Sequence, residues 1–245
     1  VSRIQLAAGS PTTLRREPAR TQPKVVALTF DDGPWRDSTD AILAELKAAG
    51  VRATFFMTGT QLRNRPVTAR RVLAAGMEIG THSNTHKLLG HASKALVRSE
   101  IGGGVAQMQR TLGITPLWYR PAGGSVSGFV RSETKRRGLR LILWTIDPRD
   151  WSRPGVSTIV SRVLGRVRPG SVILMHDGGG DRSQSVAALA KILHGLAARG
   201  YRMVTLSELY HVSQADPQAV PDAAMPRLYG VVPLYGGPAA PAQKP

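Results

Sequence analysis

The stretch ALTFDDGPW, residues 27–35, places two carboxylates, Asp31 and Asp32, at the end of an apolar run and directly before a Gly-Pro turn. A short apolar run bounded by turn residues is typical of a buried strand. Asp-Asp-Gly-Pro is also ordinary turn chemistry, because Asp side chains accept hydrogen bonds from nearby backbone amides. Alternatively, the pair divides two tasks, one carboxylate binding a cation and the other acting as a base. The stretch alone leaves both interpretations open.

Six further apolar runs repeat this arrangement, each followed by a polar or Gly-rich loop and then, in most cases, by a segment with helical spacing. The seven runs are 25–30, 53–57, 77–80, 117–119, 140–146, 172–175 and 201–204. Four helical segments, 40–49, 67–75, 128–137 and 186–199, are each followed directly by a glycine. Glycine is favoured there because it adopts the left-handed conformation that ends a helix.

Strands that alternate with helices predict βαβ units and a parallel sheet. We therefore expect an α/β fold, a distorted or incomplete (β/α) barrel of about seven parallel strands, with an open doubly wound sheet as the alternative. Residues 93–112 are also expected to form a helix, although Gly102, Gly103 and Gly104 lie inside it and each costs about 1 kcal/mol relative to Ala.

Composition sets the domain boundaries. Residues 1–23 carry three prolines and scattered charge, and we expect an extended lead-in or linker. Residues 24–211 are expected to form one catalytic domain, and 212–245 a Pro/Ala/Gly-rich tail that is partly packed. The chain starts at Val1, which suggests that any targeting segment is absent from this sequence. No run approaches the roughly 18 apolar residues of a membrane-spanning helix.

The chain is strongly basic, with 33 Lys and Arg, 16 Asp and Glu, and a net charge of +17. Such a charge attracts polyanions, including nucleic acid, anionic membranes and acidic cell-wall polymers. No basic stretch is interleaved with aromatic residues, so nucleic acid is not an expected partner. The chain has no cysteine, which excludes disulfides and thiolate metal ligands.

The unusual polar residues follow the predicted strands. In β/α barrels, reactive groups lie at the C-terminal ends of the strands, so these side chains are expected to share one rim. They are Asp31 and Asp32 after the first run, His82 and His86 after the third, Arg120 after the fourth, Asp147 and Asp150 after the fifth, and His176 and Asp177 after the sixth. His91, His194 and His211 lie elsewhere and are assigned to packing or solvent.

Each of the other polar motifs has two interpretations. HSNTH, residues 82–86, spaces two imidazoles so that both can reach one metal, although the motif alone is a weak signal and fits two surface histidines better. With a carboxylate from another strand end, they complete a two-His, one-carboxylate set.

Arg120 is either solvated or holds a carboxylate through two parallel hydrogen bonds. Trp151 beside Asp150 is either a buried loop residue or a flat binding surface, and His176 can exchange protons near neutral pH.

Together and in this order, five strings resemble the polysaccharide deacetylases of carbohydrate esterase family four, which contain the NodB homology domain. The strings are TFDDGP (29–34), HSNTH (82–86), RPAGG (120–124), DPRDW (147–151) and LMHD (174–177), and the resemblance covers about residues 24–210. It implies that Asp32, His82 and His86 bind a divalent metal, usually zinc, with Co²⁺, Mn²⁺ or Ni²⁺ as alternatives.

The resemblance also implies the remaining roles. Asp31 is the general base, supported by Arg120, and His176 is the general acid, tuned by Asp150. Trp151 and Leu174 line the acetyl and sugar pocket, and the Gly123 backbone N–H is the oxyanion donor. Two positions depart from the common family pattern. Gly123 stands where a bulky residue, often Tyr, is frequent, and Lys87 stands where Pro often follows the second metal histidine.

The expected activity is hydrolytic removal of N-acetyl groups from N-acetylglucosamine polymers, either peptidoglycan or chitin and its oligosaccharides, with release of acetate. Alternatives are an acetylxylan (O-acetyl) esterase and, in another class, a non-catalytic protein that binds anionic polymers. An extracytoplasmic location is inferred from the resemblance, and the charge suggests electrostatic attachment to an acidic cell wall.

Overall fold

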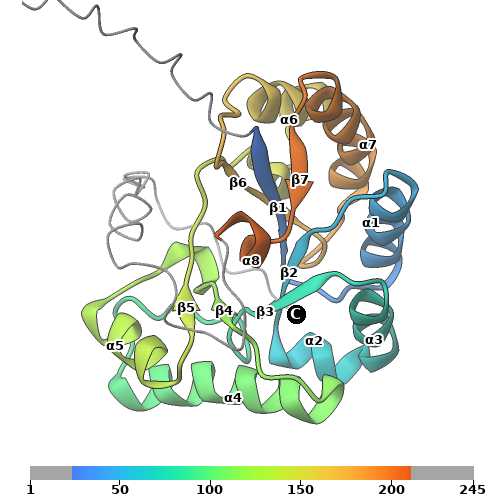
Figure 1. The fold of residues 1–245 in the computed structure, drawn as a ribbon. Helices are drawn as coiled ribbons and strands as arrows, with labels where there is room; N and C mark the ends of the chain where they lie inside the picture. Colours follow the sequence, from blue (N-terminus) through green and yellow to red (C-terminus); the bar gives the residue numbers. More distant parts are fainter. Residues whose placement is uncertain (1–23, 211–245) are drawn as a thin grey trace, which may run out of the picture.

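The computed structural model describes residues 24–210, and at its centre is a seven-stranded parallel sheet (Figure 1). The strands are β1 (Val25–Asp31), β2 (Thr54–Met57), β3 (Glu78–Thr81), β4 (Trp118–Tyr119), β5 (Arg140–Leu141), β6 (Val172–His176) and β7 (Arg202–Val204). Their order is β5-β4-β3-β2-β1-β6, and β7 pairs with the first residues of β1. A bridge between Ile146 and Ile173 joins the segment after β5 to β6 at the opposite edge. The sheet therefore curves into a half-barrel, which confirms the predicted distorted barrel.

One predicted strand is shorter than expected. The run 140–146 forms a strand only at Arg140–Leu141, and its backbone then leaves the sheet. The Leu143 carbonyl instead accepts a hydrogen bond from Arg120 Nη2 at 2.9 Å. Ile146 rejoins the sheet at β6. A side chain inserted into the barrel thus takes the place of regular strand pairing.

Helices surround the strands in Figure 1. They are α1 (Arg36–Ala48), α2 (Gly59–Asn64), α3 (Pro66–Ala74), α4 (Lys94–Leu112), α5 (Gly128–Arg136), α6 (Val156–Leu164), α7 (Ser183–Ala198) and α8 (Leu206–Leu209), with 3₁₀ turns η1 (Ala122–Gly124) and η2 (Asp150–Ser152). The glycines predicted to follow four helices have φ of 64° to 74°, as that position requires. Helices α2, α6 and α8 were not predicted from the sequence. The predicted lead-in and tail, and His211, lie outside the described residues.

Side chains of β1 alternate between two cores. Val26, Leu28 and Phe30 belong to the large outer cluster beneath the helices. Ala27 belongs to a smaller cluster inside the barrel, with Phe56 and Trp118. Successive strand residues face opposite sides, so Thr29 and Asp31 face the interior as Ala27 does.

Helix α8 covers the N-terminal ends of β2 and β3. Leu206 N donates to Thr54 Oγ1 at 3.0 Å, and Ser207 N donates to Glu78 Oε2 at 3.2 Å. Thr54 and Glu78 are the first residues of their strands. This end of the barrel is therefore filled, and the inward-facing polar groups of β1 lie toward the opposite end.

The glycine triplet of α4 brings this helix close to the loop after β3. A Cβ added at Gly104 would lie 2.5 Å from Thr81 Oγ1 and 2.8 Å from the Ser83 carbonyl oxygen. At Gly103 it would lie 3.0 Å from Asn84 Cβ. The predicted helix is confirmed, and its low intrinsic propensity is offset by packing directly against the loop that carries His82 and His86.

Candidate active site

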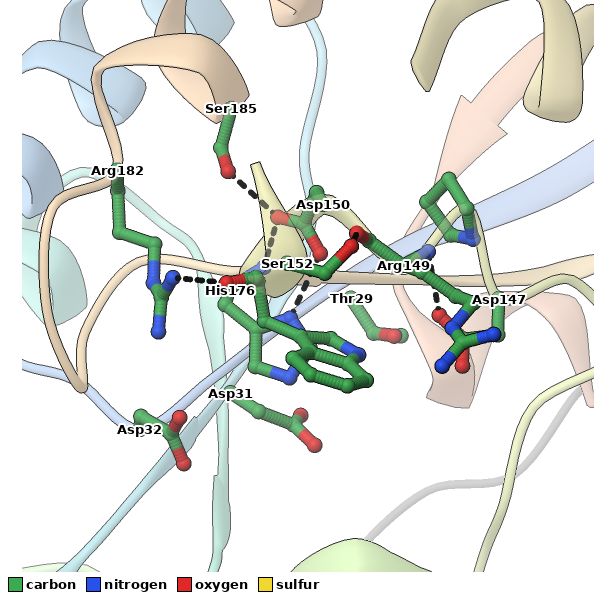
Figure 2. Close-up of polar contacts among 12 residues, drawn as sticks. Thr29, Asp31, Asp32, Asp147, Arg149, Asp150, Ser152, His176, Arg182 and Ser185 are labelled. Atoms are coloured by element: carbon green, nitrogen blue, oxygen red, sulfur yellow. Dashed lines mark hydrogen bonds and ion pairs between the residues drawn. The ribbon is translucent and has the colours of Figure 1, made fainter. Parts of the chain in front are cut away.

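The C-terminal ends of the strands bring together most of the polar residues singled out in the sequence. Asp31 ends β1 and Asp32 follows it, His82 and His86 follow β3, and Arg120 follows β4. His176 ends β6, next to Asp31 in the strand register, and Leu174 is aligned with Thr29. Figure 2 shows His176 between Asp150 and the pair of Asp31 and Asp32. One rim thus holds both carboxylates, the imidazoles and the buried guanidinium.

Asp32, His82 and His86 form a compact set of metal-ligating groups. Their ligand atoms all lie within 4.8 Å of one another. Asp32 Oδ1 is 3.0 Å from His86 Nε2 and 3.5 Å from His82 Nε2. Asp32 and His86 both have positive φ, 77° and 63°. Such backbone costs energy in non-glycine residues and is concentrated at functional sites.

The protonation of His82 tests whether this set fits a cation. Its Nδ1 lies 2.7 Å from the Arg120 carbonyl oxygen, which can only accept, so Nδ1 carries the proton. In the neutral ring the lone pair of Nε2 then faces Asp31 Oδ2 at 3.6 Å and Asp32 Oδ1 at 3.5 Å. Asp32 Oδ1 is buried and accepts no hydrogen bond of good geometry among the described residues. Electron-rich atoms that face one another in this way fit a bound cation.

The electrostatics of the set agree with that fit. Burial alone would raise the pKa of Asp32, but the adjacent imidazoles of His82 and His86 hold it well below its usual range. Burial would lower the pKa of His86, and the Asp32 carboxylate outweighs burial and raises it. Asp32 is thus ionised at neutral pH and available as a ligand.

Arg120 fixes one oxygen of Asp31. The Arg120 side chain is fully buried, and its Nη1 donates to Asp31 Oδ1 and to Thr29 Oγ1, both at 2.8 Å. The guanidinium also lies over the Phe56 ring, 4.2 Å from its centroid. With Oδ1 engaged in this way, Oδ2 is the Asp31 oxygen that faces His82.

His176 belongs to a separate hydrogen-bonded group. Its Nδ1 lies 2.8 Å from Asp150 Oδ1, and its backbone N donates to Asp150 Oδ2 at 2.9 Å. Ser185 Oγ, at the start of α7, donates to the same Oδ2 at 2.6 Å (Figure 2). Burial would lower the pKa of His176, but the charge of Asp150 and its hydrogen bond raise it to about 9. The imidazole is therefore protonated at neutral pH.

Two rim carboxylates have local structural roles. Asp147 accepts a hydrogen bond from Arg149 N at 2.7 Å, as an aspartate in a turn does. Asp177 is buried, and its Oδ2 accepts from Thr39 Oγ1 at 2.6 Å. A Cβ at Gly33 would lie 2.0 Å from this oxygen, so only glycine fits there. Burial raises the pKa of Asp177 to about 7. We assign Asp177 to packing of the Gly33 turn.

Three polar residues that support the site were not singled out in the sequence. Glu100 of α4 accepts hydrogen bonds from Asn84 N at 3.2 Å and Thr85 N at 2.8 Å, which holds the loop between the two histidines. Arg182 is buried and donates to the Gly178 carbonyl at 2.6 Å and the Trp151 carbonyl at 3.2 Å. Ser185 is the third. A buried polar residue on a helix has no spacing that distinguishes it from a surface residue.

The remaining predicted residues lie at the edge of the site. Leu174 is 3% exposed on β6, and Trp151 is half-buried in η2 next to Asp150. Gly123 is exposed in η1, with a φ of 57°. His91 and His194 are exposed, as expected for histidines assigned to packing or solvent.

Comparisons with known proteins agree with the geometry. The family model described as polysaccharide deacetylase matches residues 19–142. A peptidoglycan-N-acetylglucosamine deacetylase of Bacillus cereus is 42% identical over 188 residues, covering 76% of this chain and 88% of that protein. A chitooligosaccharide deacetylase of Bradyrhizobium sp. is 36% identical over 197 residues, covering 76% and 90%.

Solved structures give the same result. The crystal structure of the peptidoglycan N-acetylglucosamine deacetylase Bc1960, in complex with a hydroxamate-type benzamide, has a TM-score of 0.75 and 35% identity and covers 78% of this chain and 90% of that chain. The chain therefore belongs to the polysaccharide deacetylases of carbohydrate esterase family four and is an enzyme of that family.

Proposed function

We propose that the enzyme is a metal-dependent hydrolase that removes N-acetyl groups from N-acetylglucosamine residues of peptidoglycan or chitooligosaccharides and releases acetate. The observation that carries the proposal is the compact set of Asp32, His82 and His86 next to Asp31, with the protonated His176 nearby. This arrangement supplies a cation site, a base and an acid at one rim.

The cation is proposed to be divalent, with Zn²⁺ first and Co²⁺, Mn²⁺ or Ni²⁺ as alternatives, held by Asp32, His82 and His86. When bound, it supplies Lewis-acid polarisation of the acetyl carbonyl and makes water easier to deprotonate. Two imidazoles and one carboxylate leave coordination positions open for these purposes.

The chain's own residues divide the proton transfers. Asp31 accepts a proton from water at Oδ2, since Arg120 engages Oδ1. His176 carries a proton at Nε2, because Nδ1 is bonded to Asp150, and it donates that proton to the leaving amine. The products are acetate and a free amino sugar, in which the C–N bond of the amide has been replaced by C–O and N–H bonds.

We assign substrate positioning to three residues. Trp151 and Leu174 form the wall of the acetyl and sugar pocket on the His176 side, supported by the hydrogen bond from Arg182 to the Trp151 carbonyl. The backbone N–H of Gly123 is the proposed donor to the oxyanion. Because Gly123 has no side chain, the pocket wall at this position is more open than it would be with a Tyr.

The test is acetate release from chitooligosaccharides and peptidoglycan, with acetylxylan in parallel, in the presence of zinc, cobalt or manganese. Acetate from the two N-acetylated substrates supports the proposal. Release from acetylxylan alone would support the O-acetyl esterase instead. Salt-sensitive binding to polyanions with no turnover on any substrate would support a non-catalytic protein.

Location and attachment are part of the same proposal. No helix within residues 24–210 is long and apolar enough to cross a membrane. Residues 24–211 hold 27 basic and 13 acidic side chains, so most of the positive charge lies on the catalytic domain. We propose an extracytoplasmic enzyme retained on acidic cell wall through this charge, and binding to wall fragments should weaken as salt rises.

A further inference from the structure

An open pocket of about 330 Å³ lies between the start of α1 and the segment from α2 to α3. It is lined by three arginines, Arg36, Arg65 and Arg71, by two aspartates, and by the exposed Val67. None of these residues belongs to the catalytic groups described above. Figure 1 shows α1, α2 and α3 on the same side of the barrel.

The two segments that line this pocket are both connected to the loops that carry the metal-binding set, one through the chain and the other through hydrogen bonds. Trp35 is three residues beyond Asp32, a separation that spans at most about 11 Å of chain. Gly59, the first residue of α2, donates its backbone N–H to Ser83 O in the histidine loop at 3.0 Å, and Thr58 N donates to Gly33 O at 3.1 Å. A polymer bound at the catalytic groups therefore has this pocket beside it.

The arginines of the pocket differ in their partners. Arg71 Nη2 donates to Asp40 Oδ2 at 2.7 Å, so these two charges offset each other. Arg65 lies over the Trp35 ring, 4.8 Å from its centroid, and donates to the Gln61 side chain. The Arg36 guanidinium makes no hydrogen bond or ion pair with another side chain in the 24–210 range. The guanidinium groups of Arg36 and Arg65 thus face the pocket with N–H donors that have no partner yet among the described residues. The described lining of the pocket has a single exposed carboxylate, Asp37, to offset their charge.

This charge distribution suits a carboxylate. A guanidinium presents a planar set of N–H donors that matches the two oxygens of a carboxylate, and stacking on Trp35 orders Arg65 before a ligand arrives. Neutral chitooligosaccharides carry no such group. Peptidoglycan carries carboxylates on its peptides, and on its lactyl ether wherever the peptide has been removed.

We infer that the pocket lined by Arg36 and Arg65 is a carboxylate-binding subsite that favours peptidoglycan over chitooligosaccharides. The inference rests on the proposed deacetylase function and names its substrate class. The carboxylate contributes to binding of the polymer and takes no part in the proton transfers at Asp31 and His176.

The experiment compares kcat/KM on four substrates of equal sugar number. They are peptidoglycan fragments with peptides, fragments with peptides removed but the lactyl carboxylate kept, the same fragments with carboxylates converted to amides, and chitooligosaccharides. The enzymes are the wild type, the double variant Arg36→Gln/Arg65→Gln, and Lys47→Gln/Arg70→Gln. The last pair removes the same charge from exposed positions outside the pocket.

The wild type is expected to prefer a carboxylate-bearing fragment over its amidated form by about fivefold, the upper range for a partly exposed charge pair. Arg36→Gln/Arg65→Gln should remove this preference through KM and leave kcat/KM on chitooligosaccharides unchanged, whereas Lys47→Gln/Arg70→Gln should keep it. Comparison of the first two substrates identifies the peptide or the lactyl carboxylate as the group bound.

Two outcomes overturn the inference. The first is equal kcat/KM on carboxylate-bearing and amidated fragments. The second is an equal loss of kcat/KM on all substrates in the double variant. Either result means that the pocket does not bind a carboxylate. Either result leaves the deacetylase function standing. No acetate from any of the four substrates would instead contradict the proposed function itself.

Discussion

The two halves of the site keep their side chains in place by different means. In the metal-and-base half (Asp31, Asp32, His82, His86 and Arg120), imidazole and carboxylate lone pairs face one another, and Asp32 and His86 adopt positive φ. In the acid half (Asp150, His176 and Ser185), every close contact joins a donor to an acceptor. The first half fits a bound cation, whereas the second is complete as a hydrogen-bonded group. A change in one half should therefore affect measurements that a change in the other does not.

The largest expected effect comes from removing a metal ligand. His82→Ala should lose the bound metal and lower acetate release by more than about a thousandfold, because the open cation site cannot form. Chelation of the wild type should give the same loss and be reversed by added metal. His91→Ala, which removes an exposed histidine, is the matched control. Retention of one metal per chain in His82→Ala would contradict the assigned ligand set.

A smaller effect is expected in the acid half. Asp150→Asn should lower kcat about a hundredfold, within the range for general acid catalysis, while the metal stays bound. His176 donates a proton, so the wild type should lose activity as the pH rises through its pKa of about 9. Removal of the Asp150 charge leaves burial to lower that pKa, so the basic limb of the pH–rate profile should move to lower pH. An unchanged basic limb would show that another group titrates there.

Glu100→Gln tests the loop between the two histidines. Glu100 accepts two backbone N–H groups with Oε2 and the Thr85 hydroxyl with Oε1, and an amide cannot provide both oxygens as acceptors. Metal affinity should fall about tenfold, as for other groups that orient metal ligands. Calorimetric titration with zinc measures this loss, and kcat at saturating metal should be nearly unchanged. Wild-type affinity would show that α4 does not position the loop.

The smallest effect is expected from Ser185→Ala. Loss of the hydrogen bond to Asp150 Oδ2 should lower kcat about threefold to tenfold, which corresponds to about 1 kcal/mol, the typical net contribution of one hydrogen bond. The metal content should not change. Ser183→Ala, on the same helix but without a contact to Asp150, is the control for helix stability. Equal kcat in the two variants would show that the hydrogen bond from Ser185 to Asp150 does not contribute to catalysis.

The fold was predictable where the chain repeats a local pattern. Apolar runs, helical spacing and the glycines after four of the helices predict the half-barrel, since each reflects backbone and burial rules that act within a few residues. The end of β5 at Leu141 was not predictable, because it depends on the side chain of Arg120, which follows the neighbouring strand β4 and reaches the Leu143 carbonyl.

The site was predictable to a similar extent. The residues at strand ends stand out in sequence, whereas Glu100 and Ser185 act from α4 and α7 and have no such signal. The reason for Gly104 also appears only in three dimensions, where the helix backbone meets Ser83. The pocket of Arg36 and Arg65 likewise combines two segments that are separate in sequence.

The most direct test is the metal content and acetate release of Asp31→Asn. Asp31 lies beside the cation site but is assigned to the base, with its Oδ1 held by Arg120. The account predicts one metal per chain, as in the wild type, and no measurable acetate from N-acetylated glycan. Acetate release near the wild-type rate would contradict the assignment of Asp31 as base. Loss of the metal would contradict the assignment of Asp32, and not Asp31, as the metal ligand.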